Sequence, residues 1–410
     1  MIRKIKGIVL NDYYFMILYL ILAFLIPTSL NNNFLNLILK LSLLWGGCIC
    51  IYNLYTSFKN KFNKIEIIVL LFLGTTFIFN IFFYRSGENI KTWIVNVILL
   101  YGIFIKQRDK DDNQIKKELL NLSIIIVLIT TCLSIISIIL YIINKNYACR
   151  TEGTFQGIFN YNNSLAISAG ISLILSIYLY FCLRKRYRYL FVFNCIFEMI
   201  IVILSEGRSV YLLFIAIPLM YIYINIKNKI LRRIILGSGI IVGVGSFIAF
   251  SDKLYNFLSA RNELWTSALM VIKENIFTGV GYSNLVDSVK NVRKDVLLPG
   301  IEFGGVHNIF MQVATVNGII VLFIFIILLG ITLSKLVNML LCKNKLDLPM
   351  FFLGVLVVGL LLVNVFESNI LYITSYISII FWAYLGRLIS IRNEDVENKK
   401  WKNQVLQSQQ

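Results

Sequence analysis

Three side chains in predicted loops or at predicted helix ends could take part in a reaction. Arg208 and Arg261 could bind an anion, and His307 could accept a proton. A guanidinium group binds oxyanions through two parallel hydrogen bonds and keeps its charge at neutral pH. An imidazole ring can act as a general base near neutral pH, and His307 is the only histidine of the chain. If these groups met in one place, they would suit a reaction that needs fixed positive charge and proton transfer.

Each of these residues also has an alternative role that involves no reaction. Arg208 lies in the short turn 205–209 and could extend towards the membrane interface, while Arg261 could belong to an ordinary ion pair. The acidic partners nearby in the sequence are Glu206 for Arg208, and Glu263 or Glu302 for Arg261. His307 could be a hydrogen-bonded interfacial residue, and one histidine without neighbouring Cys or carboxylate ligands does not predict a zinc site.

The composition places these residues in a membrane protein. Hydrophobic residues make up 58% of the 410 residues and charged residues 15%, with a mean hydropathy of +0.78. Such a chain has too little polar surface to be a secreted, nucleoplasmic or cytosolic enzyme. Its seven cysteines include no CxxC pair, and nearly all fall in or beside apolar runs, so neither a disulfide framework nor a thiolate metal site is indicated.

Long apolar runs predict an all-α, polytopic integral membrane protein with about 12 transmembrane helices and one long exoplasmic loop. The predicted spans are 12–28, 34–56, 65–84, 90–105, 119–143, 163–183, 189–205, 208–225, 234–250, 307–330, 349–367 and 371–390. The chain then divides into helices 1 to 9 in 1–250, the exoplasmic loop 251–306, helices 10 to 12 in 307–390, and a cytoplasmic tail, 391–410.

Lys and Arg are distributed unequally between the two sides of the predicted membrane. The side with both termini carries 27 of them and the opposite side 11, while Lys40 lies inside a span. Because cytoplasmic loops are enriched in Lys and Arg, both termini are expected in the cytoplasm. The net charge of +18 is then mostly a consequence of topology. Anionic lipids suffice as its partner, and no nucleic acid is expected.

The long loop contains a predicted amphipathic helix at 260–274 that would lie along the membrane surface. Its apolar residues at helical spacing are Leu264, Trp265, Ala268, Leu269 and Ile272. A turn punctuated by glycine follows at 278–284. Inside the predicted membrane, Lys40 and Glu198 could form a structural pair or belong to a proton path, and the sequence leaves both open.

The order of several motifs resembles the O-antigen ligase and polymerase superfamily of bacterial polysaccharide assembly, over roughly residues 150–330. The motifs are Gly153-Thr154-Phe155-Gln156-Gly157 with Phe159-Asn160-Tyr161-Asn162-Asn163-Ser164-Leu165-Ala166; Glu206-Gly207-Arg208-Ser209; Arg261 with Leu264-Trp265; Gly279-Val280-Gly281; His307-Asn308; and Asn317-Gly318. The resemblance implies an outward-facing cavity beneath the long loop and a glycosyl transfer that uses no metal or cofactor. It assigns pyrophosphate binding to Arg208 and Arg261, and activation of the acceptor to His307. Further substrate contacts are expected from Arg150, Asn162, Tyr282, Asn308 and Gln312.

The resemblance predicts a glycosyltransferase of the bacterial cytoplasmic membrane that polymerises oligosaccharide repeat units of O-antigen or capsule on the outer face. Its expected partners are an undecaprenyl-diphosphate-linked glycan donor, a glycan acceptor, the lipid bilayer and a chain-length regulator. Three alternatives remain: an O-antigen ligase that transfers the glycan to lipid A-core, an oligosaccharide transferase that modifies protein, and a transporter or flippase of lipid-linked sugars. A transporter is disfavoured because no internal repeat is visible in the sequence.

Overall fold

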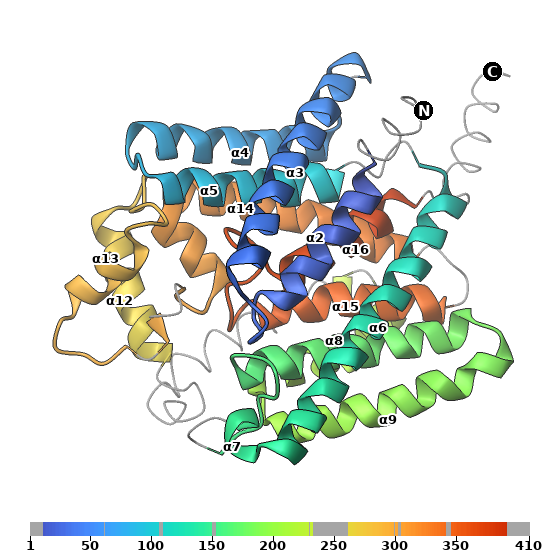
Figure 1. Ribbon diagram of the computed structural model, residues 1–410. Helices are drawn as coiled ribbons and strands as arrows, with labels where there is room; N and C mark the ends of the chain where they lie inside the picture. The colour runs from blue at the N-terminus through green and yellow to red at the C-terminus, as the bar shows by residue number, and fades with distance from the viewer. Residues whose placement is uncertain are drawn as a thin grey trace, which may run out of the picture.

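The computed structural model is helical throughout the residues that it describes (Figure 1). These residues are 11–60, 62–105, 110–149, 153–228, 230–232, 261–298, 300–301, 305–341 and 346–391. In these ranges the only β structure consists of two isolated bridges, Thr28 with Phe159 and Cys149 with Phe155. The all-α class predicted from the sequence is confirmed.

The helices follow one another with short connections, as expected for a chain that crosses a bilayer repeatedly. The first half contains α2 (Asp12–Leu25), α3 (Asn33–Asn60), α4 (Lys64–Phe82), α5 (Gly87–Val97), the π-helix η1 (Ile98–Phe104), α6 (Asp112–Ile143), α7 (Lys145–Ala148) and α8 (Asn162–Cys182). The second half contains η3 (Lys185–Tyr187), α9 (Arg188–Ser205), η4 (Arg208–Val210), α10 (Tyr211–Asn225), α12 (Arg261–Glu274), α13 (Leu285–Val292), α14 (Ile309–Leu341), α15 (Leu348–Val363) and α16 (Tyr376–Ser390).

Every predicted span overlaps a helix except 234–250, which lies outside the described residues, as does the tail from 392 onward. Within the described part, six helices are long and apolar enough to cross a membrane, and they lie at Asn33–Lys59, Asp112–Ile143, Asn162–Cys182, Lys185–Ser205, Arg208–Asn225 and Ile309–Leu341. The helices α2, α15 and α16 are apolar but shorter. The protein is therefore a multi-pass helical membrane protein, and the count of twelve spans stays a prediction.

Polar side chains at the helix starts explain several of the boundaries. Asn63 accepts a hydrogen bond from the amide of Glu66 at 2.8 Å, and the carboxylate of Glu66 accepts one from the amide of Asn63, so that the two residues form a capping box for α4. Ser375 and Ser378 form the equivalent box at the start of α16. These contacts satisfy amides that have no partner inside the helix.

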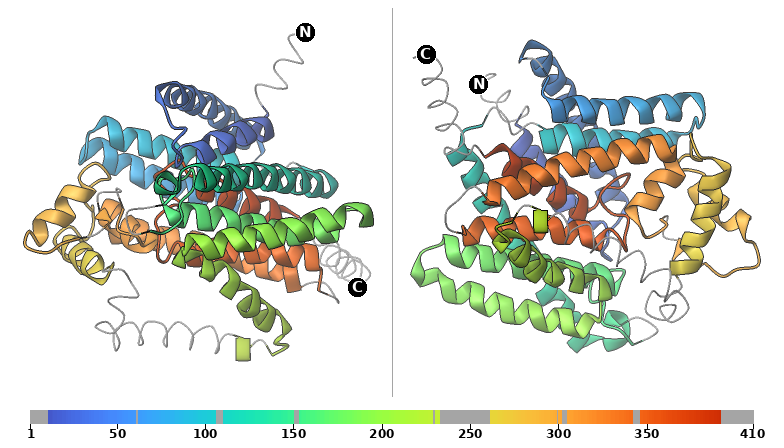
Figure 2. Two further views of the ribbon diagram at one scale, coloured as in Figure 1. Left: turned by 60° about the horizontal axis from the view of Figure 1, so that its bottom comes forward. Right: turned by 180° about the vertical axis from the view of Figure 1, so that it is seen from behind.

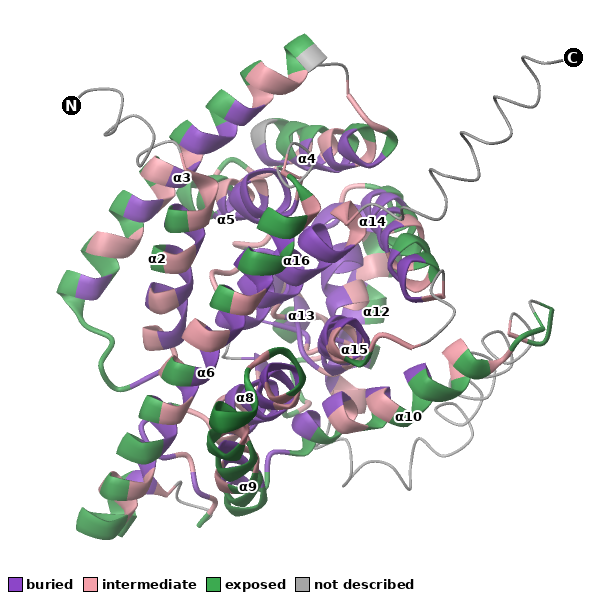
Figure 3. Cartoon of the chain, turned by 90° about the vertical axis from the view of Figure 1, so that its right-hand side faces the viewer, coloured by how far each residue is buried: buried purple, intermediate pink, exposed green. Residues whose placement is uncertain are grey.

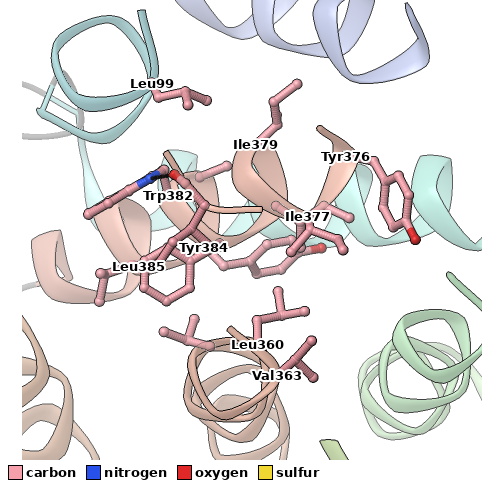
Figure 4. Packing of buried hydrophobic residues seen from close by; sticks show 14 of the residues in the cluster. Leu99, Leu360, Val363, Tyr376, Ile377, Ile379, Trp382, Tyr384 and Leu385 are labelled. Carbon is pink, nitrogen blue, oxygen red and sulfur yellow. Dashed lines mark hydrogen bonds between the residues drawn. The ribbon is translucent and has the colours of Figure 1, made fainter. Parts of the chain in front are cut away.

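The core of the bundle lies around η1, α8, α15 and α16 (Figure 3). All residues of η1 are buried, and so is every residue of α16 except the last two. Figure 4 shows α16 between η1 and α15, with Trp382 on the side of Leu99 and with Leu360 below α16. The rings of Trp382 and Phe104 pack edge to face, with centroids 5.1 Å apart.

Large apolar side chains cover the outer faces of the peripheral helices. On α9, Phe193 is 74% exposed and Ile203 63%, and on α3 Leu44 is 69% exposed. A water-soluble protein rarely leaves such surfaces uncovered, whereas lipid tails solvate them without cost. The outer surface of the bundle is therefore suited to a bilayer.

The helices α12 and α13 lie together at one end of the bundle, where α12 packs against α13 and α14. The turn at η3, between α8 and α9, lies at the opposite end (Figures 1 and 2). The helix predicted at 260–274 is present as α12, Arg261–Glu274, and its position along the membrane surface stays a prediction. Leu269 is 50% exposed, whereas Val271 is buried with Leu264 and Trp265.

A break inside α14 joins this helix to the loop that follows α12. Gly318 has φ 81° and ψ 174°, which interrupts the helix. The amides of Val280 and Gly281 donate to the carbonyls of Thr315 and Val316, both at 2.9 Å, and the amide of Ile319 donates to the carbonyl of Ile276 at 2.8 Å. The loop thus satisfies backbone groups that the break would otherwise leave without partners.

The structure does not pair Lys40 with Glu198, so the paired alternative from the sequence is wrong. Lys40 is exposed on α3, whereas Glu198 is fully buried on α9 and its Oε2 accepts a hydrogen bond from Ser134 at 2.9 Å. The two residues lie on helices that face different neighbours, because α9 packs against α6 and α8.

Candidate active site

Glu367, in the loop between α15 and α16, is the acceptor shared by four side chains. Its Oε1 accepts hydrogen bonds from Arg261 Nη2 at 2.9 Å, Ser209 Oγ at 2.9 Å and Asn163 Nδ2 at 3.3 Å. Its Oε2 lies 3.1 Å from His307 Nδ1. The donors come from the start of α12, from η4, from the start of α8 and from the turn before α14, so this one carboxylate joins four distant segments of the chain.

The first turn of α12 and the turn before α14 hold Arg261 and His307 next to each other. Trp265 Nε1 on α12 donates to the carbonyl of Val306 at 2.9 Å, which fixes the helix against the residue that precedes His307. His307 has φ 50°, a left-handed conformation that costs free energy in any residue with a Cβ. A strained backbone held at the position of the predicted base is consistent with a functional constraint on this side chain.

Asn308 and Gln312, both expected to contact substrate, stabilise the backbone around His307. Asn308 Oδ1 accepts hydrogen bonds from the amides of Phe310 and Met311, at 3.0 and 3.1 Å, and so caps α14. Gln312 is buried, and its Oε1 accepts from the amide of Val306 at 3.3 Å. The structure gives both residues a supporting role, and their contact with substrate stays a prediction.

The loop that carries Glu367 is shaped by the buried residue Asn364. Its Nδ2 donates to the carbonyl of Leu360 at 2.8 Å, and its Oδ1 accepts from the amide of Asn369 at 2.7 Å. The carbonyl of Asn364 also accepts from the amide of Ile309 at 3.0 Å. These bonds tie the end of α15 to the start of α14, which keeps the carboxylate of Glu367 in reach of the His307 ring.

The segment around Arg208 approaches the same carboxylate through its neighbour Ser209. Asn162 Nδ2 at the start of α8 donates to the carbonyl of Ser205 at 3.0 Å, which holds the end of α9 in place. The Arg208 side chain itself is exposed. The fold therefore brings the backbone of Arg208 beside the groups that bind Glu367, with its guanidinium at the surface.

The charge state of Glu367 follows from two opposing effects. Burial by itself would raise the pKa of this carboxyl group, but the hydrogen bond from His307 and the positive charge of Arg261 outweigh burial and lower the pKa from 4.5 to about 2. At neutral pH, Glu367 is therefore an anion that can only accept hydrogen bonds. Its negative charge offsets part of the positive charge that Arg261 brings to the site.

Tyr282 lies apart from the groups that bind Glu367. Its ring stacks on that of Tyr372, with centroids 5.7 Å apart, and burial raises the pKa of its hydroxyl to about 12. The hydroxyl of Tyr372 donates to Asn317 Oδ1 at 2.8 Å, beside the break in α14. Substrate binding by Tyr282 stays a prediction, and Arg150 lies outside the described residues.

The ion-pair alternative suggested by the sequence for Arg261 needs a correction. Arg261 pairs with Glu367 and not with Glu263, which instead lies 2.6 Å from Arg293 Nη1. Its other suggested partner, Glu302, lies outside the described residues. The pairing differs because α12 points Arg261 towards α14 and the α15–α16 loop, whereas Glu263 faces the end of α13.

Sequence reasoning missed Glu367, the residue at the centre of the site. The apolar run predicts Glu367 as the last residue of the span 349–367, but α15 ends at Val363 and Glu367 belongs to the loop. The available signal was an acidic residue at the end of a span on the same predicted face as the two arginines and the histidine. An unexplained charge at that depth indicates a partner of opposite charge nearby.

Within the ranges that the structure describes, no group of three or more His, Cys, Asp or Glu side chains is arranged to hold a metal ion. The cysteines in those ranges are all free thiols. The grouped side chains instead comprise an arginine, a histidine, a serine and an asparagine around one carboxylate. Such a set can bind an anion and transfer a proton.

Residues 193–326 match a family model described as O-antigen ligase. The matched range runs from α9 into α14, contains Arg208, Arg261 and His307, and ends before Glu367. The chain matches no curated protein. Together with the helical membrane fold and the arrangement of Arg261 and His307, this match supports the predicted resemblance of the chain to the O-antigen ligase and polymerase superfamily.

Proposed function

We propose that this protein is a glycosyltransferase that polymerises undecaprenyl-diphosphate-linked oligosaccharide repeat units on the outer face of the cytoplasmic membrane. Arg261 and Arg208 bind the diphosphate of the donor, and His307 accepts the proton of the acceptor hydroxyl. The observation that carries the proposal is the convergence of Arg261 and His307 on one carboxylate, at 2.9 and 3.1 Å. A group for the leaving anion and a group for the proton are thereby held side by side.

The reaction divides into changes that these side chains can assist. The oxygen of the acceptor hydroxyl attacks the anomeric carbon of the donor sugar, and its proton passes to the imidazole of His307. The bond between the anomeric carbon and the phosphate oxygen breaks, and the diphosphate leaves with its electron pair. Guanidinium groups stabilise this developing negative charge, which is the electrostatic task that a metal ion performs in other phosphate-transfer sites.

The family match supports a transferase and gives no support to a flippase of lipid-linked sugars. An O-antigen ligase is the second candidate, because ligase and polymerase share the donor and differ in the acceptor. A polymerase is preferred since no residue of the chain indicates a lipid A-core acceptor. Purified protein supplied with lipid-linked repeat units alone should form oligomers, whereas a ligase would form product only when lipid A-core is added.

The central test is synthesis of polymer by the purified protein from a lipid-linked repeat unit, in the presence of a chelator. We expect wild-type protein to form a ladder of products, and His307→Ala to lose about 10²- to 10⁴-fold in rate because the general base is removed. Arg261→Ala and Arg208→Ala should lose about 10²- to 10³-fold, as expected for loss of one group that stabilises the leaving charge.

Arg293→Ala is the matched control for the arginine variants. Arg293 pairs with Glu263 at the end of α13 and is not among the residues that bind Glu367. This variant should retain nearly full activity, with expression equal to wild type. Near-normal polymer from His307→Ala, Arg261→Ala and Arg208→Ala together would contradict the proposed function, and a requirement for added metal would contradict its metal independence.

A further inference from the structure

Both ring nitrogens of His307 face hydrogen-bond acceptors. Nδ1 lies 3.1 Å from Glu367 Oε2, and Nε2 lies 3.3 Å from the carbonyl oxygen of Gly300. A neutral imidazole has one N–H donor and one acceptor nitrogen, so only one of these contacts can be a hydrogen bond in the neutral ring. The neighbours therefore decide which nitrogen keeps its hydrogen.

The two acceptors are unequal. Glu367 is an ionised carboxylate that accepts from Arg261, Ser209 and Asn163 on its other oxygen, whereas Gly300 offers an uncharged carbonyl. A hydrogen bond to an anion is shorter and stronger than one to a neutral group. A bare Nδ1 lone pair facing the carboxylate would be repelled by it, so the hydrogen stays on Nδ1.

We propose that Glu367 is a positioning residue that holds His307 in the Nδ1–H tautomer and thereby makes Nε2 the nitrogen that accepts the proton. This inference rests on the proposed function for its catalytic meaning, but the tautomer itself does not depend on any substrate. The acceptor hydroxyl then donates to Nε2, the ring nitrogen on the side of the Gly300 carbonyl. The proton moves from the hydroxyl oxygen to Nε2 as that oxygen bonds to the anomeric carbon.

The same carboxylate also fixes the distance between the base and the anion-binding group. Arg261 and His307 bond to different oxygens of Glu367, so neither can rotate away without losing its bond to the shared anion. Groups that are oriented before substrate binds need no reorganisation during the reaction. Glu367 thus acts through His307 and Arg261, without itself touching the reacting atoms.

For the variant Glu367→Gln we can predict which ring nitrogen of His307 carries the hydrogen, because the two carboxylate oxygens of Glu367 have different partners. Oε1 accepts from three donors, so the amide oxygen of Glu367→Gln should stay on that side. The amide NH₂ then points at His307 and donates to Nδ1. This variant should therefore reverse the tautomer, and the hydrogen should move to Nε2, where the ring can no longer accept a proton from substrate.

The single histidine of the chain allows a direct measurement. Protein labelled with ¹⁵N-histidine gives ring signals from His307 alone, and the couplings of each nitrogen to the ring protons identify which one carries hydrogen. At a pH where the ring is neutral, we expect Nδ1–H in the wild type and Nε2–H in Glu367→Gln. An Nε2–H tautomer in the wild type would overturn the inference without reference to any variant.

The kinetic expectation is a loss of about 10²-fold or more in kcat for Glu367→Gln, with a smaller effect on KM. Glu367→Asp keeps the anion on a shorter side chain and should restore the Nδ1–H tautomer and part of the rate. Glu263→Gln is the matched control, because it removes a charge from α12 that pairs with Arg293 and should alter neither readout. An unchanged tautomer and an unchanged kcat in Glu367→Gln would both contradict the role of Glu367.

The two proposals fail in different ways. If the protein makes no product from lipid-linked sugars but the ¹⁵N spectra show the expected reversal, the proposed function is wrong and the tautomer inference stands. If polymer forms and depends on His307, but the wild-type ring is in the Nε2–H form, the function stands and the positioning role of Glu367 is wrong.

Discussion

Glu367 resolves an electrostatic problem that a site of this kind faces before its substrate arrives. The Arg261 guanidinium loses hydration when the protein folds around it, since its side chain is only 17% exposed. A buried carboxylate that accepts from Arg261, while His307, Ser209 and Asn163 complete its bonds, offsets this cost. The residue that sequence analysis missed is therefore the one that joins Arg261 to His307.

The depressed pKa of Glu367 predicts how stability depends on pH. The pKa falls from 4.5 to about 2 on folding, so the ionised carboxylate stabilises the folded protein by about 3 kcal/mol. This contribution is fully present above the unfolded pKa of 4.5 and is lost as the pH falls towards 2. Thermal unfolding of wild type and Glu367→Gln should differ at pH 5, just above the unfolded pKa of this carboxyl group. The difference should shrink as the pH falls from about 4 towards 2, and a difference that grows over that range would contradict this assignment.

The chemistry of single residues was predictable from the sequence, but their partners were not. Arg208, Arg261 and His307 stand out because cations are scarce on the predicted outer face and histidine occurs once. Arg261 and His307 meet through Glu367, which is separated from them by 106 and 60 positions in the chain. Residue type and local spacing carry no information about contacts at that separation, so the carboxylate appears only when the fold is known.

At the scale of elements, the broken helix α14 supports the loop next to the site. The break at Gly318 exposes carbonyls that the loop after α12 binds through Val280 and Gly281. A helix that kept all its own hydrogen bonds could not hold this loop by its backbone. Because α12 carries Arg261 and α14 begins just after His307, the break helps to fix the two elements relative to each other.

Gly318→Ala should therefore destabilise the protein. Gly318 has φ 81°, which strains any residue with a Cβ, and the added Cβ would lie 2.2 Å from the carbonyl oxygen of Phe277. We expect a loss of at least about 2 kcal/mol, seen as a clear fall in the melting temperature in detergent.

Gly330→Ala, in the same helix, is the matched control for Gly318→Ala. Gly330 has regular helical geometry, and an added Cβ would meet nothing within 4 Å. Alanine is the better helix former, so this variant should be about 0.5–1 kcal/mol more stable than wild type. Equal melting temperatures for the two variants would show that the break does not need glycine.

The positions of elements were easier to predict than the faces they bury. Every apolar run that falls within the described residues overlaps a helix, because length and hydropathy alone define such segments. In α12, by contrast, Leu269 was expected on the same apolar face as Leu264 but is half exposed, while Val271 packs inward. Periodicity indicates that a helix has an apolar side, but the neighbours α13 and α14 decide which residues lie at the centre of that side.

At the scale of the whole molecule, exposed apolar side chains lie around the sides of the bundle, whereas its two ends differ in their loops and in their charge. Apolar side chains surround the bundle, while α12 and α13 lie at one end and the basic turn η3 at the other. The predicted distribution of 27 Lys and Arg on one side and 11 on the other assigns the η3 end to the cytoplasm. The proposed reaction on the outer face requires this orientation, because His307 lies at the end that carries α12.

Two single-cysteine variants test the orientation in a background without the seven native cysteines. Asp295 is exposed just after α13, and Arg186 is exposed in η3. In intact spheroplasts, a thiol reagent that cannot cross membranes should label Asp295→Cys but should label Arg186→Cys only after permeabilisation. The reverse pattern would place Arg261 and His307 on the cytoplasmic side. The Lys and Arg residues in the loops at the other end would then lie outside, against the tendency of basic loops to stay in the cytoplasm. Such a result would refute an outer-face polymerase even if all three site variants were inactive, because a donor presented outside could not reach them.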